Sequence, residues 1–337
     1  MDPIADILAD LRAGKMIVLV DDEQRENEGD LVCAAQFVTP QIINFMLREA
    51  RGVLCLAMTG EDCDRLELAP QGAINTTQRG TAFTVTIDAH ERYGITTGVS
   101  AADRAKTILV ASDPSSVPDD LARPGHVNPL RARDGGVLVR AGQTEGSVDL
   151  CRLAGLRPAG VIIEVMNDDG SMARLPDLEK LCKKHDLKMC SVADIIQYRL
   201  AREQLVQRID EAVFDTPQGQ FRLIAYDSAV DALPHVALVK GDKLGQRDAT
   251  GQPVEVTEPV LVRMHSQNLL GDVFGDVSQP SGQTLRKAME MIEREGLGAV
   301  VYLRHEKMGS GLLRKLQTLH TPSGALHKGE RADEGDG

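Results

Sequence analysis

The sequence predicts a layered α/β (α+β) fold in two domains, and three observations support this. The chain has 337 residues, more than one typical domain contains. Hydrophobic residues make up 42% and aromatic residues only 3%, so the cores must be aliphatic. Apolar strand-like runs alternate with amphipathic helical patterns. We expect an N-terminal α-β-α sandwich with a mixed sheet over residues 1–205, a smaller α/β domain over 209–320, and a disordered tail over 321–337.

Helices and strands of the first half follow from periodicity and end signals. A helix with one apolar face is expected over residues 2–14, with Asp2 as a possible N-cap. A second helix is expected over residues 39–52, with Thr39 as its N-cap. Further helices are expected over 100–111, 147–155, 175–185 and 191–208, and strands over 16–20, 53–58, 83–88, 135–140 and 160–166. In the second half, strands are expected over 221–227, 235–240, 259–265 and 299–306, and helices over 282–296 and 311–320.

Composition excludes several classes of protein. The net charge of −12 disfavours nucleic acid or an anionic membrane as the main partner. The six cysteines form no CxxC pair, which indicates a reduced, cytoplasmic protein and not a disulfide scaffold. No signal peptide and no apolar run of about 20 residues is present, so we expect no membrane span.

The segment "IVLVDDEQRENEGDL", residues 17–31, carries six carboxylates and one arginine, Arg25, between two apolar strands. Charge runs are usually solvated loops. Strands at both ends would instead hold these carboxylates close together, and their repulsion is relieved by a cation or by retained protons. The loop is therefore a candidate site.

Three other segments place polar residues beside predicted strands. His126 lies in a loop, 123–136, that Pro and Gly bracket, although a lone loop histidine is usually just solvated. Arg140 ends a predicted strand and Thr144 can cap the next helix. An arginine beside a helix N-terminus can bind an anion, although an ordinary capped helix gives the same pattern. Glu164 lies inside an apolar strand, where a carboxylate is costly unless it is paired or metal-bound.

Together these features suit metal-assisted proton transfer on a small phosphorylated, hydroxylated molecule. A hard divalent cation prefers carboxylates and water, and it can stabilise an enediolate while Glu and His move protons. The residues alone do not identify the substrate.

These segments resemble 3,4-dihydroxy-2-butanone 4-phosphate synthase of riboflavin biosynthesis over residues 1 to about 200. The motifs, in the family's order, are "DDEQRENEGDL", "TAFTVTID", "SAADRA", "PGHVNPLRAR", "GGVLVRAG-TE" and "EVMNDDGSMAR". The resemblance implies a lyase, a homodimer dependent on Mg²⁺ or Mn²⁺, that converts D-ribulose 5-phosphate to the butanone phosphate and formate.

Carried over by motif, the resemblance implies a role for each matching residue. Glu26 would bind the metal, and Arg25 and Asp30 the sugar. Arg140 and Thr144 would bind the phosphate end. The positions matched by His126 and Glu164 are needed for activity in the family, with Glu164 also at the substrate, and Glu28 and Cys55 match further catalytic-pocket residues.

One position departs from the pattern. The family has His in "GHTE", as a metal ligand, where this chain has Gln143 in "GQTE". A Gln carbonyl oxygen is an acceptable Mg²⁺ ligand, so Gln143 is expected to replace that ligand with lower affinity.

The second half resembles GTP cyclohydrolase II without its chemistry. The family's three zinc cysteines fall at Asn268, Gln279 and Ser281, and Met308 stands where its reactive Arg belongs. The resemblance therefore implies a non-catalytic, zinc-free domain. Two other hypotheses remain open: a non-catalytic assembly or regulatory protein, and another sugar-phosphate lyase or isomerase on the same scaffold.

Overall fold

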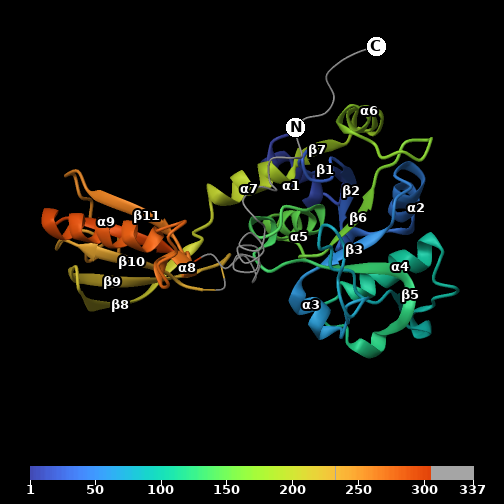
Figure 1. Ribbon diagram of the computed structural model, residues 1–337. Coiled ribbons are helices and arrows are strands. Elements are labelled where there is room, and N and C mark those ends of the chain that lie inside the picture. The colour runs from blue at the N-terminus through green and yellow to red at the C-terminus, as the bar shows by residue number, and fades with distance from the viewer. Residues whose placement is uncertain (232, 305–337) are drawn as a thin grey trace, which may run out of the picture. The chain divides into compact units, whose positions relative to one another are not determined.

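The computed structural model describes residues 1–231 and 233–304, and the chain divides into two compact units, Met1–Glu203 and from Gln204 onward. The first unit is built on a seven-stranded mixed sheet in the order β4-β5-β3-β6-β2-β1-β7 (Figure 1). Its strands are β1 Ile17–Val20, β2 Gly29–Ala34, β3 Cys55–Met58, β4 Ile87–Ala89, β5 Leu121–Arg131, β6 Gly160–Glu164 and β7 Lys188–Ser191. The predicted sandwich with a mixed sheet is confirmed.

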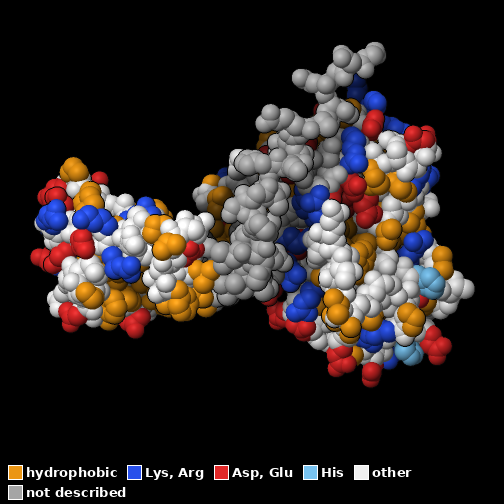
Figure 2. Space-filling view, viewed as in Figure 1, with side chains coloured by type: hydrophobic (Ala, Val, Ile, Leu, Met, Phe, Trp, Pro, Cys, Tyr) orange, Lys and Arg blue, Asp and Glu red, His pale blue; other side chains and the backbone are white. Residues whose placement is uncertain are grey.

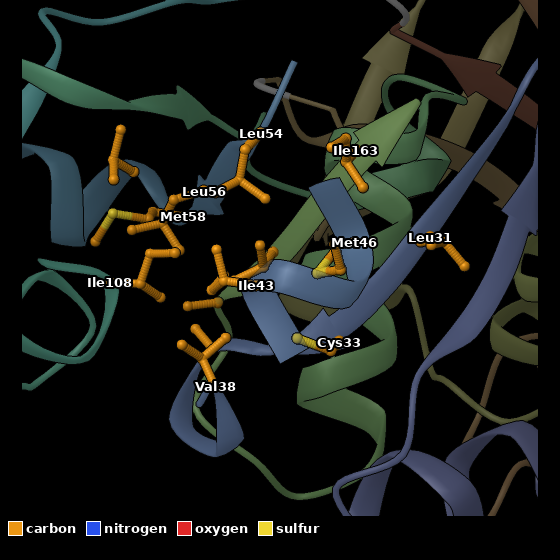
Figure 3. Close-up of a cluster of buried hydrophobic side chains, with 14 of the residues drawn as sticks. Leu31, Cys33, Val38, Ile43, Met46, Leu54, Leu56, Met58, Ile108 and Ile163 are labelled. Atoms are coloured by element: carbon orange, nitrogen blue, oxygen red, sulfur yellow. The ribbon is translucent and has the colours of Figure 1, made fainter. Parts of the chain in front are cut away.

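Helices cover both faces of this sheet. The helices are α1 Ile4–Arg12, α2 Pro40–Glu49, α3 Gly60–Arg65, α4 Ala101–Ala111, α5 Gln143–Leu153, α6 Leu175–His185 and α7 Val192–Leu200. One core lies under α2, α4 and α6, and Figure 3 shows its aliphatic and sulfur side chains, among them Ile43, Met46 and Ile108. A second core, which includes Ile7 and Leu150, lies under α1, α5 and α7. Both cores are almost entirely aliphatic, as the composition requires.

The second unit has a five-stranded sheet in the order β11-β12-β10-β9-β8, with α9 packed on it. Its elements are β8 Val206–Thr216, β9 Gly219–Ser228, β10 His235–Lys240, β11 Leu261–Ser266, α8 Leu269–Asp272, α9 Ser281–Glu295 and β12 Gly298–Leu303. The strand β8 was not predicted. The expected helix 311–320, Met308 and the tail 321–337 lie outside the described residues.

Several local predictions were wrong. The segment 135–140 is not a strand, because it contains the 3-10 helix Gly136–Leu138. His126 lies on the strand β5 and not in a loop. Asp2 does not cap α1 but accepts a hydrogen bond from the Met189 N–H. Thr144 does not cap α5, because Gly142 is the N-cap residue.

Charged side chains of both signs are interspersed over the visible face of each unit (Figure 2). Within the described residues, no helix has the length and the apolar composition that a membrane crossing requires. Of the helices that flank the sheet of the first unit, α5 is buried along most of its length, from Gln143 to Cys151.

Candidate active site

The acidic segment forms the connection of a β-hairpin between β1 and β2, which pair antiparallel with Val20 opposite Gly29. Asp21, whose side chain is fully buried, organises this connection. Its two carboxylate oxygens accept hydrogen bonds from the Glu26 and Glu28 backbone N–H groups and from Arg25 Nη1, at 3.2, 2.9 and 2.7 Å. The chain must therefore fold back around Asp21, which directs the following carboxylates to one place.

Sheet register brings Glu164 to this hairpin. Asp30 on β2 pairs with Glu164, the last residue of β6. Glu164 is half-buried at a strand end and not inside the strand, and its Oε2 accepts a hydrogen bond from the Val53 N–H at 2.8 Å. Only glycine fits at position 52, because a Cβ there would lie 2.3 Å from the Glu164 carbonyl oxygen and 2.6 Å from Oε2.

A cavity of about 460 Å³ lies at this end of the sheet. It contains nine of the ten predicted site residues: Arg25, Glu26, Glu28, Asp30, Cys55, Arg140, Gln143, Thr144 and Glu164. Gln78, Arg79, Thr81 and three apolar residues complete the lining. The four segments singled out in the sequence thus meet at one place, with His126 as the exception.

The carboxylates of this cavity repel one another. Burial raises the pKa of Asp30 well above its ordinary value, and the charges of Glu164, Glu28 and Glu26 raise it further. Asp30 Oδ1 is buried without a hydrogen-bond partner. Burial also raises the pKa of Glu28, helped by Glu26, while Arg174 opposes the shift. Such a site favours either retained protons or a bound cation.

Arg25 offsets part of this repulsion. Its Nη1 donates to Asp21 at 2.7 Å, to Glu26 at 2.8 Å and to the Gln143 carbonyl oxygen at 3.0 Å. Burial lowers the pKa of Arg25, but the hydrogen bonds and charges of Asp21 and Glu26 outweigh it and raise the pKa overall. Arg25 therefore places a positive charge in direct contact with two of the carboxylates of the acidic loop.

Arg140 also lines the cavity, close to Gly142 at the N-terminus of α5. Its Nη1 pairs with Glu145, which is buried, at 2.6 Å, and its Nη2 donates to Thr81 Oγ1 at 3.0 Å. The N-cap residue Gly142 leaves room for this approach, since a Cβ there would lie 2.5 Å from Arg140 Nη1. The N–H groups of a first helical turn together with a fixed guanidinium can bind an anion.

Cys55 lines the cavity as a neutral thiol. It is buried, and burial together with Glu164 and Asp30 raises its pKa. The thiolate is the reactive form of cysteine, so the raised pKa of Cys55 disfavours nucleophilic attack by this thiol. It contributes packing at the floor of the cavity.

His126 lies beyond the lining residues, with its side chain 46% exposed. Its Nδ1 lies 2.7 Å from Asp88 Oδ2, and its backbone N–H donates to Asp88 Oδ1 at 3.0 Å. Asn128, two residues further along β5, pairs with Cys55, which pairs with Ile162. His126 therefore projects from a row two strands away from Glu164, about 10 Å across the sheet.

Four side chains that contact predicted site residues were not singled out in the sequence: Asp21, Asp88, Glu145 and Arg79. Asp21 belongs to the charge run that was recognised, but nothing distinguished it from its neighbours. Glu145 follows directly after the "GQT" of the recognised motif, which could have indicated it. Asp88 is 38 residues from His126, and no spacing rule connects the two.

A metal ion would find oxygen ligands here, but no preformed cage. Among the described residues, no group of three or more His, Cys, Asp or Glu side chains is arranged to hold a metal. The unpartnered Asp30 Oδ1 and the mutual repulsion of the carboxylates nevertheless suit Mg²⁺, which keeps several waters and needs only one or two carboxylates from the protein. The residues present therefore fit a hard divalent ion.

Comparison with known proteins follows this division of the chain. Residues 5–198 match the profile of 3,4-dihydroxy-2-butanone 4-phosphate synthase, and residues 207–334 match that of GTP cyclohydrolase II. Among curated relatives, "Riboflavin biosynthesis protein RibBA" of a Synechocystis species is 53% identical over 94% of this chain. The chain spans only 55% of that relative's length. The protein of the same name in Aquifex aeolicus is 50% identical over 93% of this chain and 75% of its own length.

Two solved structures are similar. One is RibBX of A. baumannii, described as a two-domain 3,4-dihydroxy-2-butanone 4-phosphate synthase, with a TM-score of 0.72, 37% identity, and coverage of 94% of this chain and 88% of that chain. The other is a synthase in complex with two magnesium ions, with a TM-score of 0.57, 38% identity, and coverage of 60% of this chain and 98% of that chain.

Proposed function

The chain belongs to the 3,4-dihydroxy-2-butanone 4-phosphate synthase family, and we propose that its first unit converts D-ribulose 5-phosphate to 3,4-dihydroxy-2-butanone 4-phosphate and formate. The observation that carries the proposal is the meeting of Glu26, Asp30 and Glu164 with the Arg140 anion site in one cavity. The five-carbon phosphate divides into a four-carbon phosphate and formate with no oxidant or reductant. Acid–base groups and a metal ion therefore suffice.

The substrate's phosphate would bind at Arg140, Thr144 and the first turn of α5. Glu145 and Thr81 fix the Arg140 guanidinium, so its remaining N–H groups present a set direction to the ligand. Arg25, Asp30 and Glu164 would contact the hydroxyl groups and the carbonyl. This orientation brings the carbons that react to the carboxylate end of the cavity.

Glu26 would hold the divalent ion, Mg²⁺ or Mn²⁺, together with water and substrate oxygens. When bound, the ion supplies polarisation of the substrate's carbonyl and stabilisation of an enediolate. The similar synthase structure that contains two magnesium ions supports the choice of Mg²⁺.

Proton transfer would fall to Glu28, Glu164 and His126. A raised pKa makes Glu28 a better proton acceptor than an ordinary carboxylate, because the best catalytic pKa lies near the working pH. Asp88 fixes one ring nitrogen of His126, which leaves the other nitrogen available for proton exchange. We propose that the protein acts as a homodimer in the cytoplasm.

The second unit is proposed to lack zinc and cyclohydrolase activity. At the three positions in question, polar side chains bond to one another and to Asp272: Asn268 Nδ2 lies 3.4 Å from Gln279 Oε1, and Ser281 Oγ donates to Asp272 at 2.6 Å. Asp272 also accepts from the Tyr302 hydroxyl at 2.7 Å. Hydrogen bonds thus connect these positions, and Asp272 connects them to Tyr302 on β12. No Cys follows Cys190 in the sequence.

The test is formate release from D-ribulose 5-phosphate with Mg²⁺, with EDTA, and by Glu26→Gln. We expect activity that EDTA abolishes and that Glu26→Gln reduces at least about 10-fold. His126→Gln and Asp88→Asn should both lower kcat, the first more than the second. A metal-independent activity, or full activity of Glu26→Gln, would contradict the assignment.

A further inference from the structure

Arg25 Nη1 is surrounded by three oxygen atoms from two separate elements. Asp21 Oδ2 and Glu26 Oε2 come from the hairpin connection, and Gln143 Oε1 comes from the first turn of α5. We infer that Gln143 is a positioning residue for Arg25 and not a metal ligand. The inference rests on the proposed function, because it concerns the metal and the substrate of that same site, and it replaces the sequence-based assignment of Gln143.

Both ends of the Gln143 amide have partners. The carbonyl oxygen accepts from Arg25 at 3.0 Å, and Nε2 donates toward the Glu28 carbonyl oxygen at 3.5 Å. The side chain is buried at the start of α5, with the residue only 6% exposed. Rotating the amide to present its oxygen elsewhere would therefore break both contacts.

A cation and Arg25 cannot share this oxygen at low cost. Mg²⁺ binds oxygen ligands at about 2.1 Å, so an ion on Gln143 Oε1 would lie directly against the guanidinium that the same oxygen contacts. Like charges at this distance inside a half-buried site repel strongly. The Gln143 oxygen carries no net charge with which to compensate that repulsion.

Glu26 differs from Gln143 in this respect. Its Oε2 contacts Arg25, while its second carboxylate oxygen makes no hydrogen bond among the described residues. A carboxylate can therefore bind a cation with one oxygen and Arg25 with the other. The metal site is then Glu26 with water and substrate, and Gln143 acts on the reaction only through the direction of the Arg25 guanidinium.

If Gln143 acts through Arg25, a change at Gln143 should alter the affinity for the substrate and not the affinity for the metal. Removal of the Gln143 oxygen leaves the metal ligands unchanged, but Arg25 loses its hydrogen bond to α5. Arg25 stays paired to Asp21 and Glu26, so its charge remains in the cavity while its orientation is lost. We expect the KM for ribulose 5-phosphate to rise by about 10-fold, the effect of one charge-assisted hydrogen bond.

The experiment is a titration of Mn²⁺ by electron paramagnetic resonance without substrate, together with kcat and KM. Gln143→Leu, which has a similar volume and no oxygen, should bind Mn²⁺ within about twofold of the parent, whereas loss of a ligand would weaken binding at least about 10-fold. In an Arg25→Met background, Gln143→Leu should cause no further rise in KM, because residues that act through one another are not additive. Gln143→Met serves as the second variant if the leucine variant does not fold.

A 10-fold loss of Mn²⁺ affinity in Gln143→Leu would overturn the inference, and so would a KM effect that persists without Arg25. Glu26→Gln is the matched control and should lose Mn²⁺ affinity. If Glu26→Gln binds Mn²⁺ normally, the proposed metal site is wrong, while the coupling of Gln143 to Arg25 is still decided by the double variant.

Discussion

Glu164→Gln removes one negative charge from the cavity and changes almost nothing else. The side chain keeps its length, and an amide oxygen can still accept the Val53 N–H bond that Glu164 Oε2 accepts at 2.8 Å. Asp30 lies directly opposite on β2, and burial is the largest cause of its raised pKa. The charge of Glu164 is the next largest cause, and the variant removes it. The variant therefore separates the chemical role of Glu164 from its structural role.

Its effects on stability and on turnover should differ sharply. A weaker hydrogen bond costs about 1 kcal/mol, and relief of the repulsion with Asp30 offsets it. The net change in unfolding free energy should stay within about 1 kcal/mol, or about 4 °C in Tm. Loss of an acid–base group should instead reduce kcat by about 10²–10⁴-fold, which corresponds to about 3–5 kcal/mol in the barrier.

The assay is formate release from ribulose 5-phosphate, with thermal unfolding measured on the same preparation. Glu179→Gln, at an exposed position on α6, is the matched control and should leave both quantities unchanged. A Glu164→Gln enzyme with near-normal turnover would refute the reasoning. An unfolded variant would show that Glu164 is mainly a structural residue of the contact with Gly52 and Val53.

Three further variants test other parts of the structure. Asp30→Asn, measured in EDTA, should raise the free energy of unfolding by about 1–3 kcal/mol at neutral pH, because the pKa of Asp30 is raised in the folded protein. This gain should vanish as the pH falls below about 4, where the Asp30 carboxyl is protonated in the folded and in the unfolded protein. A gain that is independent of pH would exclude ionisation of Asp30 as the cause. Arg199→Ala should destabilise the first unit by about 3–5 kcal/mol, because Arg199 is buried and pairs with Asp149 at 2.7 Å. Arg202→Ala, at an exposed position three residues further along, should change the stability little. A fragment of residues 1–203 should fold and retain synthase activity, because both cores of the first unit lie within it. An insoluble fragment would instead show that the second unit covers apolar surface.

The sequence predicted the acidic hairpin because its evidence is local. Apolar runs flank the charges at 17–20 and 31–34, and both are strands in the structure. The cap at Thr39 was predictable for the same reason, since its hydroxyl accepts the Ile42 N–H. Local signals fix elements whose partners are a few residues away.

Predictions that depended on distant partners failed or were not possible. The sequence 123–136 looks like a loop because of its Pro and Gly residues, yet β3 and β4 pair with its first part, and residues up to Arg131 form the strand β5. The pairing of Asp30 with Glu164 depends on the strand order, which places β6 between β2 and β3. The contact of Gln143 with Arg25 spans 118 residues, so no local sequence pattern could indicate it.

The most direct measurement is an NMR assay of the purified full-length protein with D-ribulose 5-phosphate and Mg²⁺, and in parallel with GTP. We predict formate and a four-carbon phosphate in equal amounts from the sugar phosphate, no formate from GTP, and no stoichiometric zinc by elemental analysis. Isomerisation of the sugar phosphate without formate would indicate a different reaction on the same scaffold. No turnover of ribulose 5-phosphate at all, with the protein folded and Mg²⁺ present, would contradict the central claim.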